Sequence, residues 1–178
     1  DDGSADVFVH ISAVERAGMG SIVEGQKLGF GLESDNKSGK VSAGSVTVDF
    51  TAGTASGADG NDQFFGFRSV MSGAGNDTLV GDAQDNFFDA GAGDDSISGG
   101  DGIDAVAYSF ATSGVTVNLA TGTATGGGGS DTFTGIEYAR GSDHADTLIG
   151  NSGDNLFQGR AGHETIDGGA GNGTIHGG

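Results

Sequence analysis

A period of nine residues runs through two parts of this chain and restricts its possible folds more than any other feature. Four consecutive nine-residue segments, or nonads, cover residues 72–107, and four more cover residues 141–176. The sixth position holds Asp, Asn or Glu in seven of the eight nonads, and the eighth position always holds a large apolar residue. The apolar set is Leu79, Phe88, Ile97, Val106, Leu148, Phe157, Ile166 and Ile175. Such a pattern predicts a repeat architecture in which each unit packs on its neighbours.

The nonads lie inside a longer duplication. Residues 46–109 align with residues 115–178 without a gap, and more than a third of the aligned positions are identical. The match begins before the nonads, where VTVDFTAGTASG corresponds to VTVNLATGTATG. We therefore divide the chain into an N-terminal segment (1–45), a first repeat unit (46–109) and a second repeat unit (110–178).

Composition narrows the partners that the chain can have. The formal charge is −18, which argues against a nucleic-acid backbone as partner and favours cations. The chain has 38 glycines but no proline and no cysteine. A disordered acidic linker is the competing interpretation of the nonads, but linkers usually carry proline and lack a regular apolar position. No stretch resembles a membrane span or an N-terminal signal peptide.

The nonads resemble the hemolysin-type (RTX) calcium-binding repeat G-G-x-G-x-D-x-U-x, where U is a large aliphatic residue. This resemblance implies an all-β fold, a parallel β-roll (RTX solenoid), here in two arrays with β inserts. Six residues of each nonad form a turn, three form a short strand, and two nonads complete one coil. Apolar side chains two nonads apart then stack, and the expected pairs are Leu79 on Ile97, Phe88 on Val106, Leu148 on Ile166 and Phe157 on Ile175.

The energetic balance indicates that such a roll needs a bound cation to fold. One buried apolar side chain contributes roughly 1.5–3 kcal/mol, whereas each ordered residue costs roughly 1–2 kcal/mol of backbone entropy. Stacking also brings carboxylates one strand spacing apart, where like charges repel by about 4 kcal/mol at an effective dielectric constant near 20. Calcium suits these turns because it accepts six to eight oxygen ligands in flexible geometry, whereas magnesium demands rigid octahedral geometry. We therefore expect Ca²⁺ as the cofactor.

The expected calcium ligands are the glycine turns and the sixth-position side chains. Turns on the same side of the roll form the sites, which pairs Asp77 with Asp95, Asn86 with Asp104, Asp146 with Glu164, and Asn155 with the turn at 168–173. The glycines are Gly73, Gly75, Gly91, Gly93, Gly100, Gly102, Gly153, Gly162, Gly169 and Gly171. Glu164 and Gly173 depart from the family pattern at the sixth position, so the last turns are less typical.

Within the inserts at 46–71 and 115–140, VTVDF (46–50) and VTVNL (115–119) alternate apolar and polar residues, which predicts strands. We expect their large apolar residues to cover the neighbouring roll; these are Phe64, Phe65, Phe67, Phe133, Ile136 and Tyr138.

Residues 6–46 resemble the C-terminal part of a bacterial cold-shock domain, a small β segment like half of an OB-type barrel. In that family Phe8 and His10, within VFVHIS, would stack on bases. The first half of the barrel is absent upstream, and the local charge is negative. Nucleic acid is therefore not expected as a partner.

The sequence contains no recognisable catalytic motif. Its histidines match no zinc spacing, and no serine lies in a nucleophile elbow. We expect a non-enzymatic, secreted, extracellular or cell-surface module with a structural or adhesive role, which self-associates end to end into a homo-oligomer, filament or surface layer. The alternatives are a nucleic-acid-binding protein acting through the cold-shock-like segment, and a non-catalytic C-terminal fragment of an RTX toxin or protease.

Overall fold

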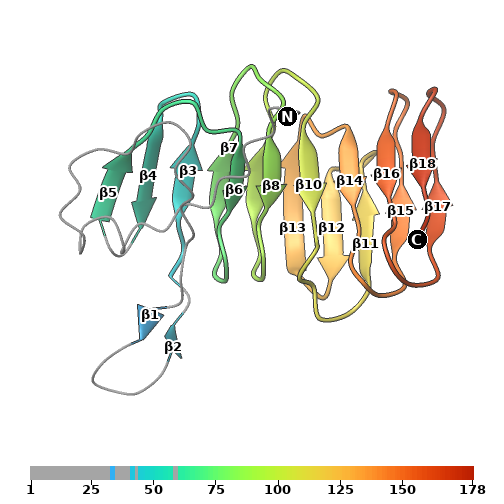
Figure 1. Ribbon diagram of the computed structural model, residues 1–178, viewed down its shortest axis with the longest axis horizontal. Helices are drawn as coiled ribbons and strands as arrows, with labels where there is room; N and C mark the ends of the chain where they lie inside the picture. The colour runs from blue at the N-terminus through green and yellow to red at the C-terminus, as the bar shows by residue number, and fades with distance from the viewer. Residues whose placement is uncertain (1–32, 35–40, 43, 58–59) are drawn as a thin grey trace, which may run out of the picture.

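A computed structural model describes residues 33–34, 41–42, 44–57 and 60–178 of the chain. Within these ranges the chain forms strands and turns, with no helix (Figure 1). This agrees with the all-β fold expected from the nonads. No helix in the described part is long and apolar enough to cross a membrane.

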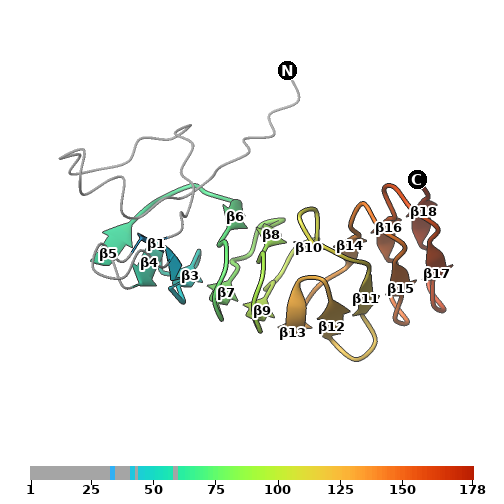
Figure 2. The same cartoon turned by 90° about the horizontal axis from the view of Figure 1, so that it is seen from below.

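Two sheets face each other and form the roll, as the two layers in Figure 2 show. The first sheet contains β6 (Ser69–Met71), β8 (Phe87–Asp89), β10 (Ala105–Ala107), β14 (Tyr138–Arg140), β16 (Leu156–Gln158) and β18 (Thr174–His176). The second contains β3 (Thr47–Asp49), β4 (Thr54–Gly57), β5 (Gly60–Gln63), β7 (Thr78–Val80), β9 (Ser96–Ser98), β11 (Val115–Asn118), β12 (Thr123–Gly126), β13 (Gly129–Thr134), β15 (Thr147–Ile149) and β17 (Thr165–Asp167). Successive nonads alternate between the two sheets, so two nonads make one coil.

The strand register confirms the expected stacking of the apolar eighth positions. Leu79 pairs with Ile97 and Phe88 with Val106 in parallel register. In the second array Leu148 pairs with Ile166. Phe157 likewise pairs with Ile175. A three-residue strand turns only its central side chain inward, so one apolar residue per nonad is sufficient to form the core between the sheets.

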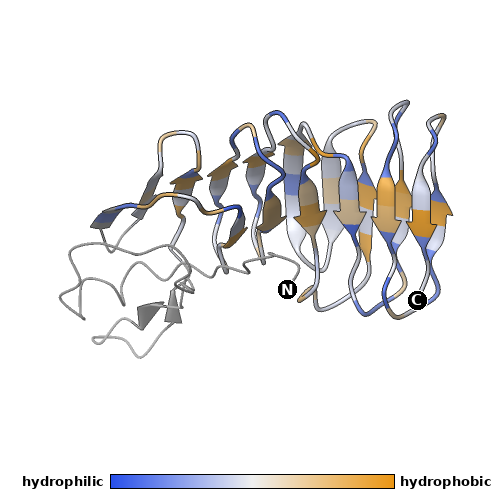
Figure 3. Cartoon of the chain, turned by 45° about the horizontal axis from the view of Figure 1, so that its top comes forward, coloured by the Kyte–Doolittle hydropathy of each residue, from blue (hydrophilic) through white to orange (hydrophobic). Residues whose placement is uncertain are grey.

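Most of these central side chains form the core between the sheets. Leu79, Phe88, Val106 and Phe157 have no exposed surface. Figure 3 shows apolar segments within many of the strands, and hydrophilic segments in many of the turns of the second array. Ile175 differs, because 51% of its surface is exposed. It lies in β18, at the edge of its sheet, where no further strand of the described chain covers it.

The inserts are part of the roll, rather than a cover laid over it. Strands β11, β12 and β13 form an antiparallel meander inside the second sheet, between β15 and β9. β13 pairs with β9 in parallel, and β14 pairs with β10 in the same way. The two arrays are therefore joined through continuous sheets. β3, β4 and β5 repeat the meander at the other end, as the duplication requires.

Aromatic side chains of the first insert belong to the hydrophobic core. Phe50, Phe64 and Phe67 are buried; Phe64 contacts both of the others edge to face, while Phe50 stacks on Phe88. Phe65 was expected to share this packing, and that expectation is wrong, because 77% of Phe65 is exposed. It follows Phe64 directly, and neighbouring residues of an extended segment point to opposite faces.

The N-terminal segment is described only in part. Within it β1 (Glu33–Ser34) and β2 (Val41–Ser42) pair antiparallel. Phe8 and His10 lie outside the described residues.

Candidate metal-binding turns

The turns of successive coils stack at backbone distance, and glycine makes this possible. Gly93 has a φ of 136°, and a Cβ built on it would lie 2.0 Å from the carbonyl oxygen of Gly75 in the preceding coil. Eight of the ten glycines expected in the sites have a positive φ, and Gly153 and Gly171 are the two that do not. The stacked turns therefore place backbone carbonyl groups close to the next coil, without intervening side chains.

Replacing Gly93 with alanine should destabilise the folded roll by roughly 1–3 kcal/mol, because the new methyl group meets a backbone carbonyl and φ becomes strained. Gly66→Ala is the matched control. Gly66 also has a positive φ, of 75°, but no atom lies within 4 Å of its built Cβ. Urea unfolding in calcium measures both variants; equal losses would show that φ strain alone acts at Gly93.

One oxygen of each acidic sixth-position side chain bonds to the neighbouring coil. The N–H of Asp77 donates to Oδ1 of Asp95 at 2.8 Å, and the N–H of Asn86 donates to Oδ1 of Asp104 at 2.8 Å. The N–H of Asp146 donates to Oε2 of Glu164, also at 2.8 Å. These are three of the four pairs predicted from the nonad spacing, and their members lie in adjacent turns.

The second oxygen of these side chains is buried without a hydrogen-bond partner. This holds for Oδ2 of Asp77, Asp95 and Asp104 and for Oε1 of Glu164. The three aspartates are between 0% and 3% exposed. A buried carboxylate oxygen that lacks a partner costs free energy, and a bound cation would remove that cost. The unpartnered oxygens therefore mark the places in the turns where a cation fits.

Three other predicted side chains are arranged differently. Asp146 has no orphaned oxygen, because it accepts from Val115 N–H and from both the N–H and the hydroxyl of Ser142. Asn86 and Asn155 each use Oδ1 to accept the N–H four residues earlier in their own turn. The backbone carbonyl of Asn155 accepts the N–H of Thr174, which sets this residue against the final turn.

Burial makes the turn carboxylates hard to ionise in the absence of metal. Desolvation raises the pKa of Asp95 to about 7, and the nearby Asp131 and Asp77 carboxylates add to the increase. Desolvation raises the pKa of Asp104 to about 6, with Glu137 and Asp85 contributing repulsion. The pKa values of Asp77 and Asp131 are also raised by burial. A group with a raised pKa favours the folded state only while it is protonated.

The metal-free roll should therefore be most stable in mild acid. For Asp95 the stabilisation is complete below its ordinary pKa of 3.8 and is lost as the pH rises through about 7. We expect the β signal in circular dichroism, measured with chelator, to weaken between pH 4 and pH 8. Saturating calcium should oppose this loss. A metal-free β signal that is constant over this range would contradict the raised pKa values.

The turns suit calcium better than they suit a metal ion that is coordinated by side chains alone. No three His, Cys, Asp or Glu side chains gather at one point among the described residues. Each stacked pair of turns instead offers one or two carboxylates together with glycine carbonyl groups. Calcium accepts carbonyl oxygens readily and tolerates irregular geometry, so this donor set suits it. When bound there, calcium supplies positive charge between the stacked carboxylates.

The sixth-position side chains of successive turns form a column on each side of the roll. Two acidic residues of the inserts continue these columns, and the sequence interpretation missed both. Oδ1 of Asp131 accepts the N–H of Asp95 at 3.0 Å, and Oε2 of Glu137 accepts the N–H of Asp104 at 3.0 Å. Each lies two residues before a buried apolar residue, Phe133 and Ala139 respectively. This acid-x-apolar spacing is the signal that could have revealed them, because it repeats positions six to eight of a nonad.

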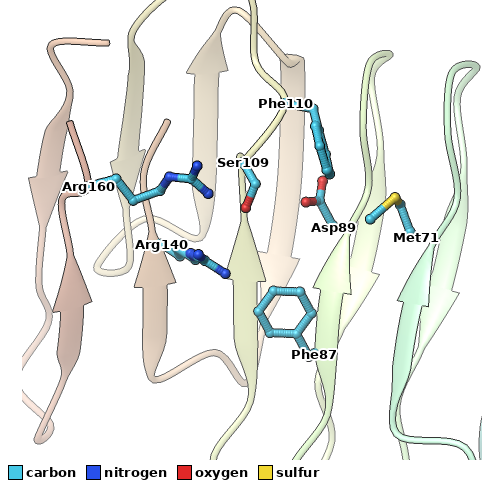
Figure 4. Close-up of a pocket in the computed structure, with 7 residues that line it drawn as sticks. All are labelled: Met71, Phe87, Asp89, Ser109, Phe110, Arg140 and Arg160. Atoms are coloured by element: carbon cyan, nitrogen blue, oxygen red, sulfur yellow. The ribbon is translucent and has the colours of Figure 1, made fainter. Parts of the chain in front are cut away.

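A separate pocket of about 300 Å³ is lined by residues outside the predicted ligand set. Figure 4 shows Asp89 and Arg140 among its lining residues, with Phe110 next to Asp89. Oδ1 of Asp89 and Nε of Arg140 are both buried without a hydrogen-bond partner. Burial raises the pKa of Asp89 to about 6, against the opposing effect of Arg140. Arg160, also on the wall, pairs with Asp143 at 2.7 Å.

The nonads, which include these turns, match a known family of calcium-binding repeats. Residues 71–106 and 140–175 match the model of the RTX calcium-binding nonapeptide repeat. The two arrays are RTX calcium-binding repeats. The RTX arrays form an all-β parallel roll, and their cofactor is calcium, as the nonad pattern predicted.

The N-terminal segment matches a different family. Residues 1–48 fit the model of the "cold-shock" DNA-binding domain. A cold shock protein of Sinorhizobium fredii and the cold shock protein CspA of Rhizobium meliloti are each 67% identical to this chain over 43 residues. These 43 residues are 24% of this chain and 62% of each relative, so the chain spans less than two thirds of their length. The cold shock-like protein CspB of Escherichia coli is 44% identical over 48 residues, which are 27% of this chain and 66% of that protein. Both matched families, RTX repeats and cold-shock domains, are non-catalytic.

Proposed function

We propose that the RTX roll is a calcium-dependent structural module whose folding is completed by metal bound between stacked turns. The observation that carries this proposal is the row of buried, unpartnered carboxylate oxygens on Asp77, Asp95 and Asp104. Each belongs to a sixth-position residue whose other oxygen holds the adjacent coil. Calcium between the turns would satisfy the free oxygens and offset the repulsion within each column.

Direct calcium binding tests this function. Isothermal titration of the full chain should show several sites, with dissociation constants of the order of 10⁻⁴–10⁻³ M that are typical of extracellular calcium modules. Magnesium should bind much more weakly. Asp104→Asn should weaken calcium binding, whereas Asp101→Asn, which removes the same charge from an exposed residue of the same turn, should not. Absence of calcium binding up to about 10 mM would refute the proposal.

We further propose that the chain acts outside the cell, in a structural or adhesive role without catalysis. Millimolar calcium is an extracellular condition, and a roll that requires it would fold only after export. The charge of −18 supports this, because it disfavours the compact state until cations bind. Fractionation of the native producer tests the location. Recovery of the protein only from the cytosol would contradict it.

Self-association through the exposed edge of the roll is also proposed. β17 and β18 are the edge strands at one end of the two sheets, and Ile175 on β18 is 51% exposed. Unpaired strand edges with exposed apolar side chains promote pairing with another chain. Sedimentation in calcium should show oligomers that Ile175→Lys reduces and that Ile103→Lys, at another exposed apolar residue, leaves intact. A monodisperse wild-type monomer would refute this extension.

Nucleic-acid binding is the second candidate function. It is favoured by the cold-shock match over residues 1–48, and the Sinorhizobium and Rhizobium relatives are named cold shock proteins. The high negative charge opposes it. Retention of fluorescent single-stranded DNA at low salt tests this candidate. Phe8→Ala and His10→Ala should abolish retention if bases stack there, since stacking contributes about 1–3 kcal/mol per base. No retention by the wild-type chain would exclude this function.

A further inference from the structure

The turn at residues 126–131 belongs to the second insert, outside the matched RTX segments, yet it stacks like a nonad turn. The N–H of Gly93 donates to the carbonyl of Gly128 at 2.8 Å, just as Gly75 N–H donates to Ala92 O at 2.8 Å in the array. A Cβ built on Gly129 would lie 1.9 Å from the carbonyl oxygen of Gly93. A Cβ built on Gly93 would likewise lie 2.0 Å from the carbonyl oxygen of Gly75.

The polar contacts of this turn repeat as well. Ser130 N–H donates to Oδ1 of Asp94 at 3.0 Å, as Asp94 N–H donates to Oδ1 of Asn76 at 3.0 Å. Asp95 N–H donates to Oδ1 of Asp131, as Asp77 N–H donates to Oδ1 of Asp95. The insert turn therefore continues the stack of array turns at its third to sixth positions.

The sequence of this segment explains the likeness. Residues 126–134 read GGGGSDTFT, which fits every specified position of G-G-x-G-x-D-x-U-x once Phe133 is taken as U. Gly126 and Gly129 pair across a tight β-hairpin turn between β12 and β13. The segment thus forms a hairpin turn and also fits the nonad pattern, although it lies outside the two arrays.

This turn and the turn at 90–95 each carry a buried carboxylate, and the charge of Asp131 acts on Asp95. Oδ2 of Asp95 is buried without a partner, and Asp95 is 3% exposed. Asp131 is also 3% exposed, and its Oδ2 accepts the hydroxyl of Tyr108 at 2.9 Å. A carboxylate oxygen can accept a phenol hydrogen bond and still coordinate a cation with its remaining lone pair.

We propose that the turns at 90–95 and 126–131 together bind a further calcium ion, which joins the end of the first array to the second insert. The ligands are the carboxylates of Asp95 and Asp131 and carbonyl groups of the two glycine turns. Tyr108 positions Asp131. This inference rests on the calcium function proposed above, and it makes Asp95 a member of two consecutive sites.

Counting bound calcium in the full chain tests this inference. Equilibrium dialysis at saturating calcium should give one ion fewer for Asp131→Ala than for wild type, and no change for Asp101→Ala. Alanine removes the carboxylate completely, whereas asparagine would keep a side-chain oxygen at this position, as Asn86 and Asn155 do in two nonads. Asp131→Glu should restore the count, since Glu164 stands at that position in another nonad.

Tyr108→Phe gives an independent measurement that leaves both carboxylates in place. The calcium count should stay at the wild-type value. One additional ion in this variant would overturn the inference, because the hydroxyl and not calcium would then occupy the wild-type turn. An unchanged count in Asp131→Ala would also overturn it while leaving the proposed function intact. Absence of binding by wild type would instead refute the function itself.

Discussion

Adding calcium to the metal-free chain at pH 7.5 should convert residues 44–178 from a largely unordered state to β structure, and a chelator should reverse the change. Without metal, carboxylates are stacked about one strand spacing, roughly 4.8 Å, apart in each column. At an effective dielectric constant near 20, each such contact costs about 3–4 kcal/mol. The apolar core of one side chain per nonad does not offset that repulsion together with the entropy of ordering nine residues.

Calcium removes the repulsion and adds binding energy. A site with a dissociation constant near 10⁻⁴ M contributes about 2.7 kcal/mol at about 10 mM calcium, and several sites act on the same roll. Far-UV circular dichroism during a calcium titration measures the transition, with magnesium at the same ionic strength as control. A spectrum that is unchanged up to about 10 mM calcium would refute calcium-dependent folding. An equal response to magnesium would show that screening of charge, and not binding, drives the transition.

Replacing Phe88 with alanine should cost about 3–5 kcal/mol of folding free energy in saturating calcium. Phe88 has no exposed surface, lies beside Val70 and Val106 in register, and stacks on Phe50. Its loss would leave a cavity in a core that has only one large residue per coil on each side. The roll should remain able to bind calcium, but at a higher midpoint concentration.

Phe65→Ala is the matched control for Phe88→Ala. It removes the same atoms from a residue that is 77% exposed, so the free energy of unfolding should change by less than about 0.5 kcal/mol. Urea denaturation of both variants in calcium compares them directly. Similar losses in the two variants would contradict the inward assignment of the eighth nonad position.

Much of the fold follows from local pattern. The nonad period predicts which side chain of each strand turns inward, and Leu79, Phe88, Leu148 and Phe157 all lie in the core. The same period predicts that Asp77 and Asp95 lie in adjacent turns, and the hydrogen bond between them agrees. These features are predictable because a coil contacts only the coils before and after it, so spacing along the chain sets distance in space.

The inserts were harder to interpret because their contacts are not periodic. Their strands were expected as a cover, whereas β13 and β14 continue the two sheets of the roll. Asp131 and Glu137 escaped notice because they lie outside the regular run of nonads, although each repeats the acid-x-apolar spacing. The pocket beside Asp89 was also unpredictable, since its walls come from β6, β8 and β14 and from residues far apart in the chain.

The sequence by itself determined the repeat unit, the inward residues, the calcium-binding character of the turns and the two-part composition of the chain. Each of these depends on residues within one nonad or on spacing between neighbouring coils. Only the tertiary structure decided that the arrays join through continuous sheets, and that Asp146 is satisfied by Ser142 while Asp95 keeps a free oxygen. Those outcomes depend on how the antiparallel meander of β11, β12 and β13 packs between β15 and β9. The register of the strands in space, and not spacing along the chain, determines the hydrogen-bond partners there.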